Sequence, residues 1–412
     1  MNKTFKFRAN AGFSLVELMV ALVLTSFLVL GLVQVFSASR TAYQSSMGVS
    51  RTQEGGRFAM DFLQRDFRLV GHSGCTNDRA HFVNAQVVGD AEFYNHLAGT
   101  SGGVVPDTNA ATAHLRFDVP MQGFEATVPG ATTPGSTIVL SAMTTPASAV
   151  PGAGSWSPTI PTGIYAGMTT NGVRPRTGSD VVILRVYSGE SAPVLTAPTA
   201  GPITTSAALA GTPGNTFAVA NCVASSVFRS SNTTGTSFTL AGNATGFTTN
   251  GQEFYANTGS NLYHADVYVY FVGFRNATPT TPPSLYRAHW NGAWTNEELV
   301  EGVDMIQMTY GQDVALVNGS VDTYAAASVV SSATPVDAAV WRAVGTVRLG
   351  LLLRSPDRAG SYTDSTAGAT RNIPIAGGAA SGGYLVTVSA NDGFLRVPYD
   401  NVIAFRNRLI GN

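Results

Sequence analysis

An apolar run near the amino terminus constrains this 412-residue chain more than any other stretch. Residues 13–36 contain a single charged side chain, that of Glu17. As a helix they would span roughly 36 Å at about 1.5 Å per residue, enough to cross a hydrocarbon core of about 30 Å. The sequence therefore predicts a membrane-crossing helix over residues 13–36.

Basic residues before the run predict its orientation. Residues 1–12 contain Lys3, Lys6 and Arg8 and no acid, and the next charge after Glu17 is that of Arg40. The positive-inside rule then places the amino terminus in the cytoplasm and everything after residue 36 outside. We expect a single-pass protein with an exported body.

Two ordinary explanations, a secretory signal peptide and a plain membrane anchor, do not account for all features of the apolar run. A cleaved secretory signal peptide has a shorter apolar region and a small-x-small cleavage site, and no such site is evident before Ser37-Ala38. A plain membrane anchor does not explain Glu17, because an acid in an apolar helix costs about 2.5–3.5 kcal/mol at mid-bilayer. The run itself offers no cationic partner for that carboxylate.

A short motif at the start of the run supplies such a partner. Residues 12–17, Gly-Phe-Ser-Leu-Val-Glu, resemble the processing motif of type IV prepilins and type II pseudopilins. The resemblance implies that a prepilin peptidase removes residues 1–12 as a leader peptide by cutting after Gly12. It also implies N-methylation of the new terminus, Phe13, and pairing of Glu17 with the terminal amine of a neighbouring subunit. Two such charges neutralise each other in a low-dielectric environment, so the pair would set the register of assembly.

An amphipathic helical stem is expected over residues 37–71. No proline occurs before Pro106, and Gly71 is a natural stop. The i,i+4 pairs Phe58/Phe62 and Leu63/Phe67 predict the face that lies against the body. We expect Arg65-Asp66 and Arg68 to lie on the solvated face of this helix. Gly48 and Gly55-Gly56 are positions where we expect the helix to bend or break.

Composition favours an exported, β-rich body without enzymatic chemistry. Charged residues make up 12% of the chain, glycine is abundant at 44 residues, and the formal net charge of −1 gives no bias toward nucleic acid. Lysine occurs only at Lys3 and Lys6, which excludes a P-loop lysine or a Schiff-base lysine from the processed protein. Ser73 does not lie in a nucleophile elbow, because the second residue after it is Cys75 instead of glycine. We therefore expect no catalytic site and no cofactor.

The two cysteines, Cys75 and Cys222, leave three possibilities. An even, sparse pair in an oxidising compartment favours one disulfide. Two free thiols are the second possibility, and a metal pair, prompted by His72-x-x-Cys75, is the third. No second Cys/His cluster has zinc spacing, so the disulfide is the favoured prediction.

Residues 72–262 are expected to form a β-rich variable body with long Gly/Thr/Pro-rich loops. These loops could be flexible linkers, but short β-like runs interrupt them at residues 137–140, 181–187 and 236–240. Residues 263–412 give sharper strand signals, with alternating apolar residues over 267–272 and 347–353 and a turn at Asn291-Gly292. This region also contains a cluster of four acids, Glu297, Glu298, Glu301 and Asp304. The cluster has no EF-hand-like loop, so we expect a solvated turn there in preference to a calcium site.

The carboxy-terminal region narrows the resemblance to one branch. The segment Leu299–Asp304, the strand that ends Leu353-Arg354-Ser355, and the terminal stretch Ala404–Arg408 resemble the large minor pilins of the PilW type. The resemblance implies an α+β, pilin-like fold: a long amino-terminal helix, half in the membrane and half packed, followed by a large β-rich globular body. The type II secretion pseudopilin J has a similar plan but is usually shorter, so it remains the alternative.

The same resemblance implies a function in assembly. The expected protein is a minor pilin in the priming or tip complex of a type IV pilus, which supports pilus biogenesis, twitching motility and adhesion. Implied partners are the prepilin peptidase, other minor pilins, the major pilin and a tip adhesin. The implied location is the inner membrane with a periplasmic body, and then the tip of the extracellular filament. The alternative is a type II secretion minor pseudopilin that serves protein export.

Overall fold

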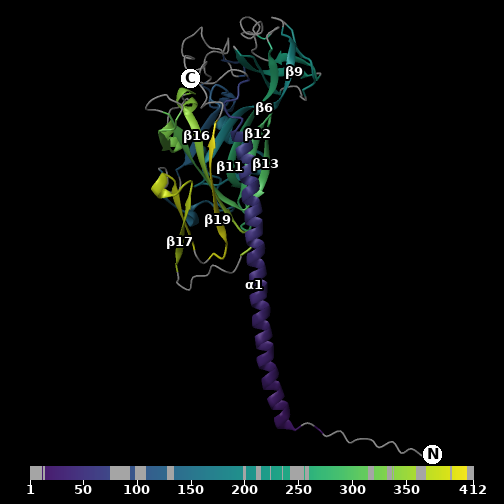
Figure 1. Ribbon diagram of the computed structural model, residues 1–412, viewed down its shortest axis with the longest axis vertical. Coiled ribbons are helices and arrows are strands. Elements are labelled where there is room, and N and C mark those ends of the chain that lie inside the picture. Colours follow the sequence, from purple (N-terminus) through teal and green to yellow (C-terminus); the bar gives the residue numbers. More distant parts are fainter. Residues whose placement is uncertain are drawn as a thin grey trace, which may run out of the picture.

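A computed structural model describes residues 12, 14–74, 93–97, 108–127, 134–197, 201–209, 215–222, 224–233, 235–241, 255, 259–313, 320–331, 336, 338–358, 368–389 and 392–405. One helix, α1 (Leu15–Phe67), projects from a β-rich body, as Figure 1 shows. Its 53 residues correspond to roughly 80 Å of helix. The expectation of a long amino-terminal helix followed by a β-rich body is confirmed.

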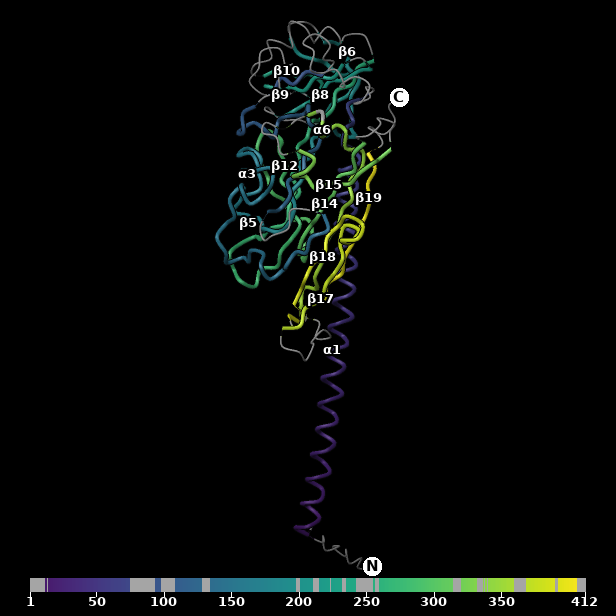
Figure 2. The backbone as a smooth tube through the Cα atoms, turned by 90° about the vertical axis from the view of Figure 1, so that its left-hand side faces the viewer, coloured from purple at the N-terminus to yellow at the C-terminus, as the bar shows by residue number. Residues whose placement is uncertain are grey.

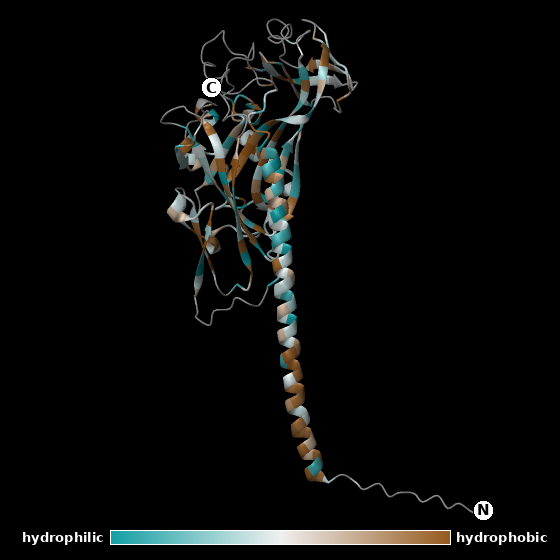
Figure 3. Ribbon diagram, viewed as in Figure 1, coloured by the Kyte–Doolittle hydropathy of each residue, from teal (hydrophilic) through white to brown (hydrophobic). Residues whose placement is uncertain are grey.

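Helix α1 begins at a capped residue and continues without interruption from its apolar half into the body. The Ser14 Oγ atom accepts a hydrogen bond from the backbone N–H of Glu17 at 3.4 Å, and the helix ends before Arg68. It continues as one helix through Gly48, Gly55 and Gly56, so a break of the helix at these glycines is excluded. Figure 3 shows the apolar residues concentrated in the half of α1 that is distant from the body.

The largest sheet contains twelve strands, and part of it closes into a barrel. Two long strands, β6 (Val181–Thr196) and β11 (Asn261–Phe274), pair with each other. Between them in the sequence lie β7 (Ile203–Thr205), β8 (Thr216–Ala220), β9 (Ser225–Thr233) and β10 (Ser237–Ala241). The pairing β6–β7–β10–β9–β8–β11–β6 is antiparallel throughout and closed.

We call these six strands the apical barrel, because β8, β9 and β10 lie at the end of the body farthest from the amino terminus (Figures 1 and 2), whereas β11 also extends into the middle of the body (Figure 1). Phe217, Phe228 and Phe238 are buried in its interior. The strands predicted at residues 181–187 and 236–240 are confirmed as parts of β6 and β10. The predicted boundary between residues 262 and 263 falls inside β11.

The remaining strands of the large sheet extend it on both sides of the barrel. On one side follow β12 (Ser284–Trp290) and β13 (Trp294–Glu301), and on the other β2 (Met121–Ala126) and β4 (Trp156–Ser157). Two short strands complete it, β1 (Phe93–Asn95) on β9 and β5 (Arg174–Pro175) on β11. Helix α3 (Thr162–Thr169) packs near β11, β12 and β13.

Two smaller sheets lie beside the large one. The four-stranded sheet is antiparallel, in the order β15 (Thr323–Ala325), β14 (Val303–Gln312), β16 (Val344–Arg354) and β19 (Arg396–Ala404). The three-stranded sheet has the order β17 (Thr370–Ile375), β18 (Tyr384–Ser389) and β3 (Thr137–Val139). Short helices α5 (Ala327–Val330) and α6 (Ala338–Arg342) precede β16.

The main core lies between α1, the large sheet and the four-stranded sheet. Helix α1 contributes Ala59, Leu63 and Phe67, which are fully buried. The pair Leu63/Phe67 therefore packs as predicted, whereas Phe58 is 54% exposed and its predicted place on the packed face is wrong. The helix residues that are buried form one stripe, Gly48, Thr52, Gly56, Ala59, Leu63, Asp66 and Phe67.

The acid cluster at residues 297–304 is only partly the solvated turn that the sequence predicts, because its three glutamates are exposed whereas Asp304 is buried. Glu297, Glu298 and Glu301 belong to β13, and the chain turns at Gly302, which has φ +86°. Asp304 is fully buried on β14 and pairs with Arg176 at 2.9 Å and with Arg396 at 2.8 Å. Within the described ranges no group of three or more His, Cys, Asp or Glu side chains has a metal-binding arrangement.

Candidate functional site

The amino-terminal motif lies at the free end of α1. Gly12 is exposed, Phe13 lies outside the described residues, and Glu17 is an exposed acid in the first helical turn. The helix dipole favours a negative charge at this end. Cleavage at Gly12, methylation at Phe13 and an assembly role for Glu17 remain predictions.

The apolar half of α1 has no protein cover in the isolated chain. Every residue from Leu15 to Phe36 is exposed, and an 18-residue window has a mean hydropathy of 2.5 with none of it buried. By length and composition this helix is able to cross a membrane. An apolar surface of this extent needs lipid or other apolar helices around it.

A close steric contact attaches the other half of α1 to the body. A Cβ atom on Gly56 would lie 2.4 Å from ring atoms of Tyr399, so only glycine allows the helix to lie this close to β19. The Tyr399 hydroxyl also donates to the backbone oxygen of Thr52 at 3.3 Å. Gly55 faces the methyl groups of Val300 and Leu353 at 3.3 and 3.4 Å from its notional Cβ. The glycine pair therefore serves helix docking.

A buried ionic contact attaches the last turn of α1. Asp66 is only 3% exposed, which corrects the expectation of a solvated face. Its Oδ2 atom accepts hydrogen bonds from the Tyr270 hydroxyl at 2.5 Å and from Arg287 Nη1 at 3.0 Å. Burial, followed by the charge of Asp66, raises the pKa of Tyr270, so the phenol stays a donor. Arg287 also reaches Glu297 at 2.7 Å, so one guanidinium joins α1, β12 and β13.

Aromatic packing completes the attachment. Phe67 of α1 stacks on Phe405, just after β19, with ring centroids 6.2 Å apart. Both rings are fully buried. Sequence periodicity predicts that Phe67 packs, but it does not reveal its partner, because the two residues lie far apart in the sequence.

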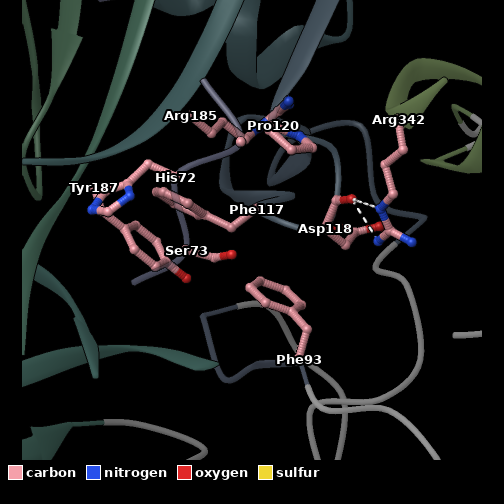
Figure 4. Close-up of a pocket in the computed structure, with 10 residues that line it drawn as sticks. His72, Ser73, Phe93, Phe117, Asp118, Pro120, Arg185, Tyr187 and Arg342 are labelled. Carbon is pink, nitrogen blue, oxygen red and sulfur yellow. Dashed lines mark hydrogen bonds between the residues drawn. The ribbon is translucent and has the colours of Figure 1, made fainter. Parts of the chain in front are cut away.

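A small pocket lies just beyond the end of α1, lined by residues 71–73 among others, as Figure 4 shows. His72, Ser73 and Asp118 all line it, but Asp118 pairs with Arg116 Nε at 2.9 Å instead of with the imidazole. Both pocket arginines bind backbone oxygens: Arg342 holds that of Asp118 at 2.7 Å, and Arg185 holds that of Val119 at 2.6 Å. The pocket groups are thus engaged in joining segments of the body.

The structure places Cys222 at the turn between β8 and β9, whereas Cys75 lies outside the described residues. The residue before Cys75 lies beside β8, because a Cβ atom on Gly74 would come within 2.7 Å of the Ala220 Cβ. This neighbourhood favours the Cys75–Cys222 disulfide, which remains a prediction. The third possibility, a metal pair with His72, involves Cys75 and so lies outside the described residues.

Comparison with known families agrees with both ends of the chain. Residues 7–33 match the family model of the prokaryotic N-terminal methylation motif, and residues 269–407 match that of type IV pilus-assembly protein W, PilW. The PilW match includes the body residues that hold α1 in the contacts described above: Tyr270, Arg287, Val300, Leu353, Tyr399 and Phe405. Most of the apical barrel lies outside both matches.

No curated protein matches the chain. Among solved structures it is similar to a type IV-like pilin from Thermus thermophilus, with 17% identity over 35% of this chain and 70% of that chain. The TM-score of 0.20 is too low for this likeness to support the fold. The two family matches support a PilW-type, prepilin-like minor pilin of the type IV pilus, a structural component of the filament.

Proposed function

We propose that this PilW-type, prepilin-like chain is a minor pilin of the priming complex that initiates type IV pilus assembly and remains at the tip. The observation that supports this proposal most strongly is that α1 has an uncovered half and a half that packs on the body. One half presents an uncovered apolar surface with a single acid, Glu17, and the other half is fixed to the PilW-matched strands. Rigid continuity between the halves lets the position of the body follow the packing of the helix.

The proposed location follows from the helix and the motif. Before assembly, residues 13–36 cross the inner membrane and the body lies in the periplasm. Prepilin peptidase removes residues 1–12, and the new amine of Phe13 and the Glu17 carboxylate pair with neighbouring subunits. Those neighbours are other minor pilins, the major pilin and a tip adhesin, and no catalysis, cofactor or nucleic acid is involved.

The apical barrel supports a place at the tip. It adds a folded unit at the end of the body opposite the membrane helix (Figures 1 and 2). In a filament whose helices all point the same way, a subunit above this one would meet the barrel, whereas a terminal subunit has free space there. The proposal includes support of twitching motility and adhesion, both of which require a complete filament.

A deletion strain distinguishes this function from that of a type II secretion pseudopilin. We expect loss of surface pili and of twitching with unchanged levels of secreted proteins, and restoration by the wild-type chain. Glu17→Gln should fail to restore pili, whereas Glu54→Gln, an exposed acid on the same helix, should restore them. Normal pili with lost secretion would refute the pilus function.

A further inference from the structure

Two buried carboxyl groups lie where the three sheets meet. Glu125 on β2 is fully buried, and its Oε1 atom accepts a hydrogen bond from the Tyr384 hydroxyl of β18 at 3.0 Å. Asp180, just before β6, accepts from the backbone N–H of Ala126 at 3.1 Å and from that of Met308 on β14 at 2.8 Å. The pair thus bonds to strands of the large, the four-stranded and the three-stranded sheet.

The other groups that face this pair are uncharged. The backbone N–H of Ala327, in α5, faces Glu125, and the hydroxyl of Tyr310 lies over Gly123 of the same strand β2. In the part of the chain that the structure describes, neither carboxyl forms an ion pair, and Glu125 Oε2 has no hydrogen-bond partner.

Other buried acids of this protein are neutralised differently. Asp304 contacts Arg176 and Arg396, and Asp66 contacts Arg287. An unpaired buried carboxylate is costly, so such a group binds a proton or a metal ion unless a cationic side chain is present. No third carboxylate, histidine or cysteine joins Glu125 and Asp180 in a metal-binding group among the described residues.

Electrostatics favours the proton. Burial, and then the neighbouring Asp180, raises the pKa of Glu125 well above its ordinary range. Burial also raises the pKa of Asp180, to about 7, even though two N–H groups favour its ionised form. Two like charges in one dry site disfavour simultaneous ionisation.

We propose that a proton held by Glu125 and Asp180 locks the three sheets together, and that its release as the pH rises toward neutrality loosens this joint. The joint connects the PilW-matched strands β14 and β18 to β2, which lies outside that match. The lock is distinct from the proposed assembly function and does not depend on it.

The direction of the pH dependence follows from the linkage between proton binding and folding. An unfolded chain releases these protons above about pH 4, whereas the folded chain keeps them to a higher pH. The folded state is therefore favoured by this pair at mildly acidic pH, and the contribution falls as the pH rises from about 4 to about 7. Each retained proton changes the unfolding equilibrium constant by up to about tenfold per pH unit in that window.

The test is thermal unfolding of the full chain in detergent micelles between pH 5 and pH 8, followed by tryptophan fluorescence. Trp156 and Trp341 are fully buried in the body, so the signal reports on its core. Glu125→Gln keeps an oxygen for Tyr384 but does not titrate, and Asp61→Asn removes an exposed acid of α1 as the matched control. The comparison of variants cancels the pH dependence that all other groups share.

We expect the folding constant of the wild type, relative to Glu125→Gln, to fall with rising pH between pH 5 and pH 7, by up to about tenfold per pH unit and less steeply where the pair loses its proton. Asp61→Asn should follow the wild type. Parallel pH profiles for the wild type and Glu125→Gln would overturn the proposal. A shift of the wild-type unfolding temperature at pH 7 on addition of Ca²⁺ or EDTA would also overturn it, because a cation would then neutralise the pair.

Infrared spectroscopy keeps the proposal testable if Glu125→Gln does not fold. The wild type should show the absorption of a protonated carboxyl group at pH 6, and that absorption should decrease by pH 8. A wild-type spectrum without a protonated carboxyl at pH 6 would refute the lock.

Discussion

Asp66→Asn isolates the ionic contact that holds the last turn of α1 against the body. The substitution keeps the size of the side chain but removes the charge that faces Arg287 at 3.0 Å and the hydroxyl of Tyr270 at 2.5 Å. Both bonds end on Oδ2, so the asparagine oxygen can still accept them, but its amide group then lies against Arg65 Nε, which donates to Oδ1 at 3.1 Å in the wild type. The contact therefore loses its negative charge and the bond from Arg65, and the bonds from Tyr270 and Arg287 become weaker.

The expected loss in the free energy of unfolding depends on which interactions remain after the substitution. Breaking a buried ion pair costs about 3–5 kcal/mol when the partner is left without a counter-charge. Arg287 keeps Glu297 at 2.7 Å, so it is not stranded. Hydrogen bonds to charged groups contribute about 1.5–3 kcal/mol each and neutral ones about 0.5–1.5 kcal/mol, so the Tyr270 bond loses about 1 kcal/mol and the Arg287 bond loses the attraction of its counter-charge. The bond from the exposed Arg65 contributes little. We expect a loss of about 2–3 kcal/mol in the free energy of unfolding.

Urea unfolding of the full chain in detergent, followed by tryptophan fluorescence, measures this loss. Asp61→Asn is the matched control, because Asp61 is exposed on the same helix and its replacement should change the free energy by no more than about 0.5 kcal/mol. A double-mutant cycle with Tyr270→Phe should give a coupling energy of about 0.5–3 kcal/mol. If Asp66→Asn matches the control, the ionic contact does not stabilise the attachment of α1.

Three further outcomes are open to direct measurement. Gly56→Ala should lower the free energy of unfolding by about 1–2 kcal/mol despite the higher helix propensity of alanine, because its Cβ meets the Tyr399 ring at 2.4 Å. Gly55→Ala is the control and should lower the free energy of unfolding by less. Equal urea midpoints for the two variants would contradict this account. Non-reducing peptide mapping should link Cys75 to Cys222, and two alkylatable thiols in the native protein would rule that out. Intact-mass analysis should show loss of residues 1–12 and one added methyl group, and a retained leader would disprove processing.

Local signals in the sequence were sufficient for the helix and for the motif. The apolar run and its single acid are contiguous, so length and composition alone predict a membrane-crossing helix at residues 13–36. Short runs of β-forming residues likewise predict the first part of β6, residues 181–187, and most of β10, because such a run is a short-range pattern.

Long-range contacts decided what these elements do. The sequence suggests weak points at Gly55-Gly56 and a solvated Asp66, because a helix pattern does not show what lies across from it. Tyr399 is 343 residues beyond Gly56, and Arg287 is 221 residues beyond Asp66, so only the folded body brings them together.

The amino-terminal helix, its processing motif and the PilW-type carboxy-terminal pattern were thus determined by the sequence itself, since each is a short-range pattern. Closure of the apical barrel through β6 and β11, the attachment of α1 and the buried carboxyl pair were decided by the tertiary structure. The physical reason is that burial and pairing depend on residues brought together from distant parts of the chain, and periodicity carries no record of those partners.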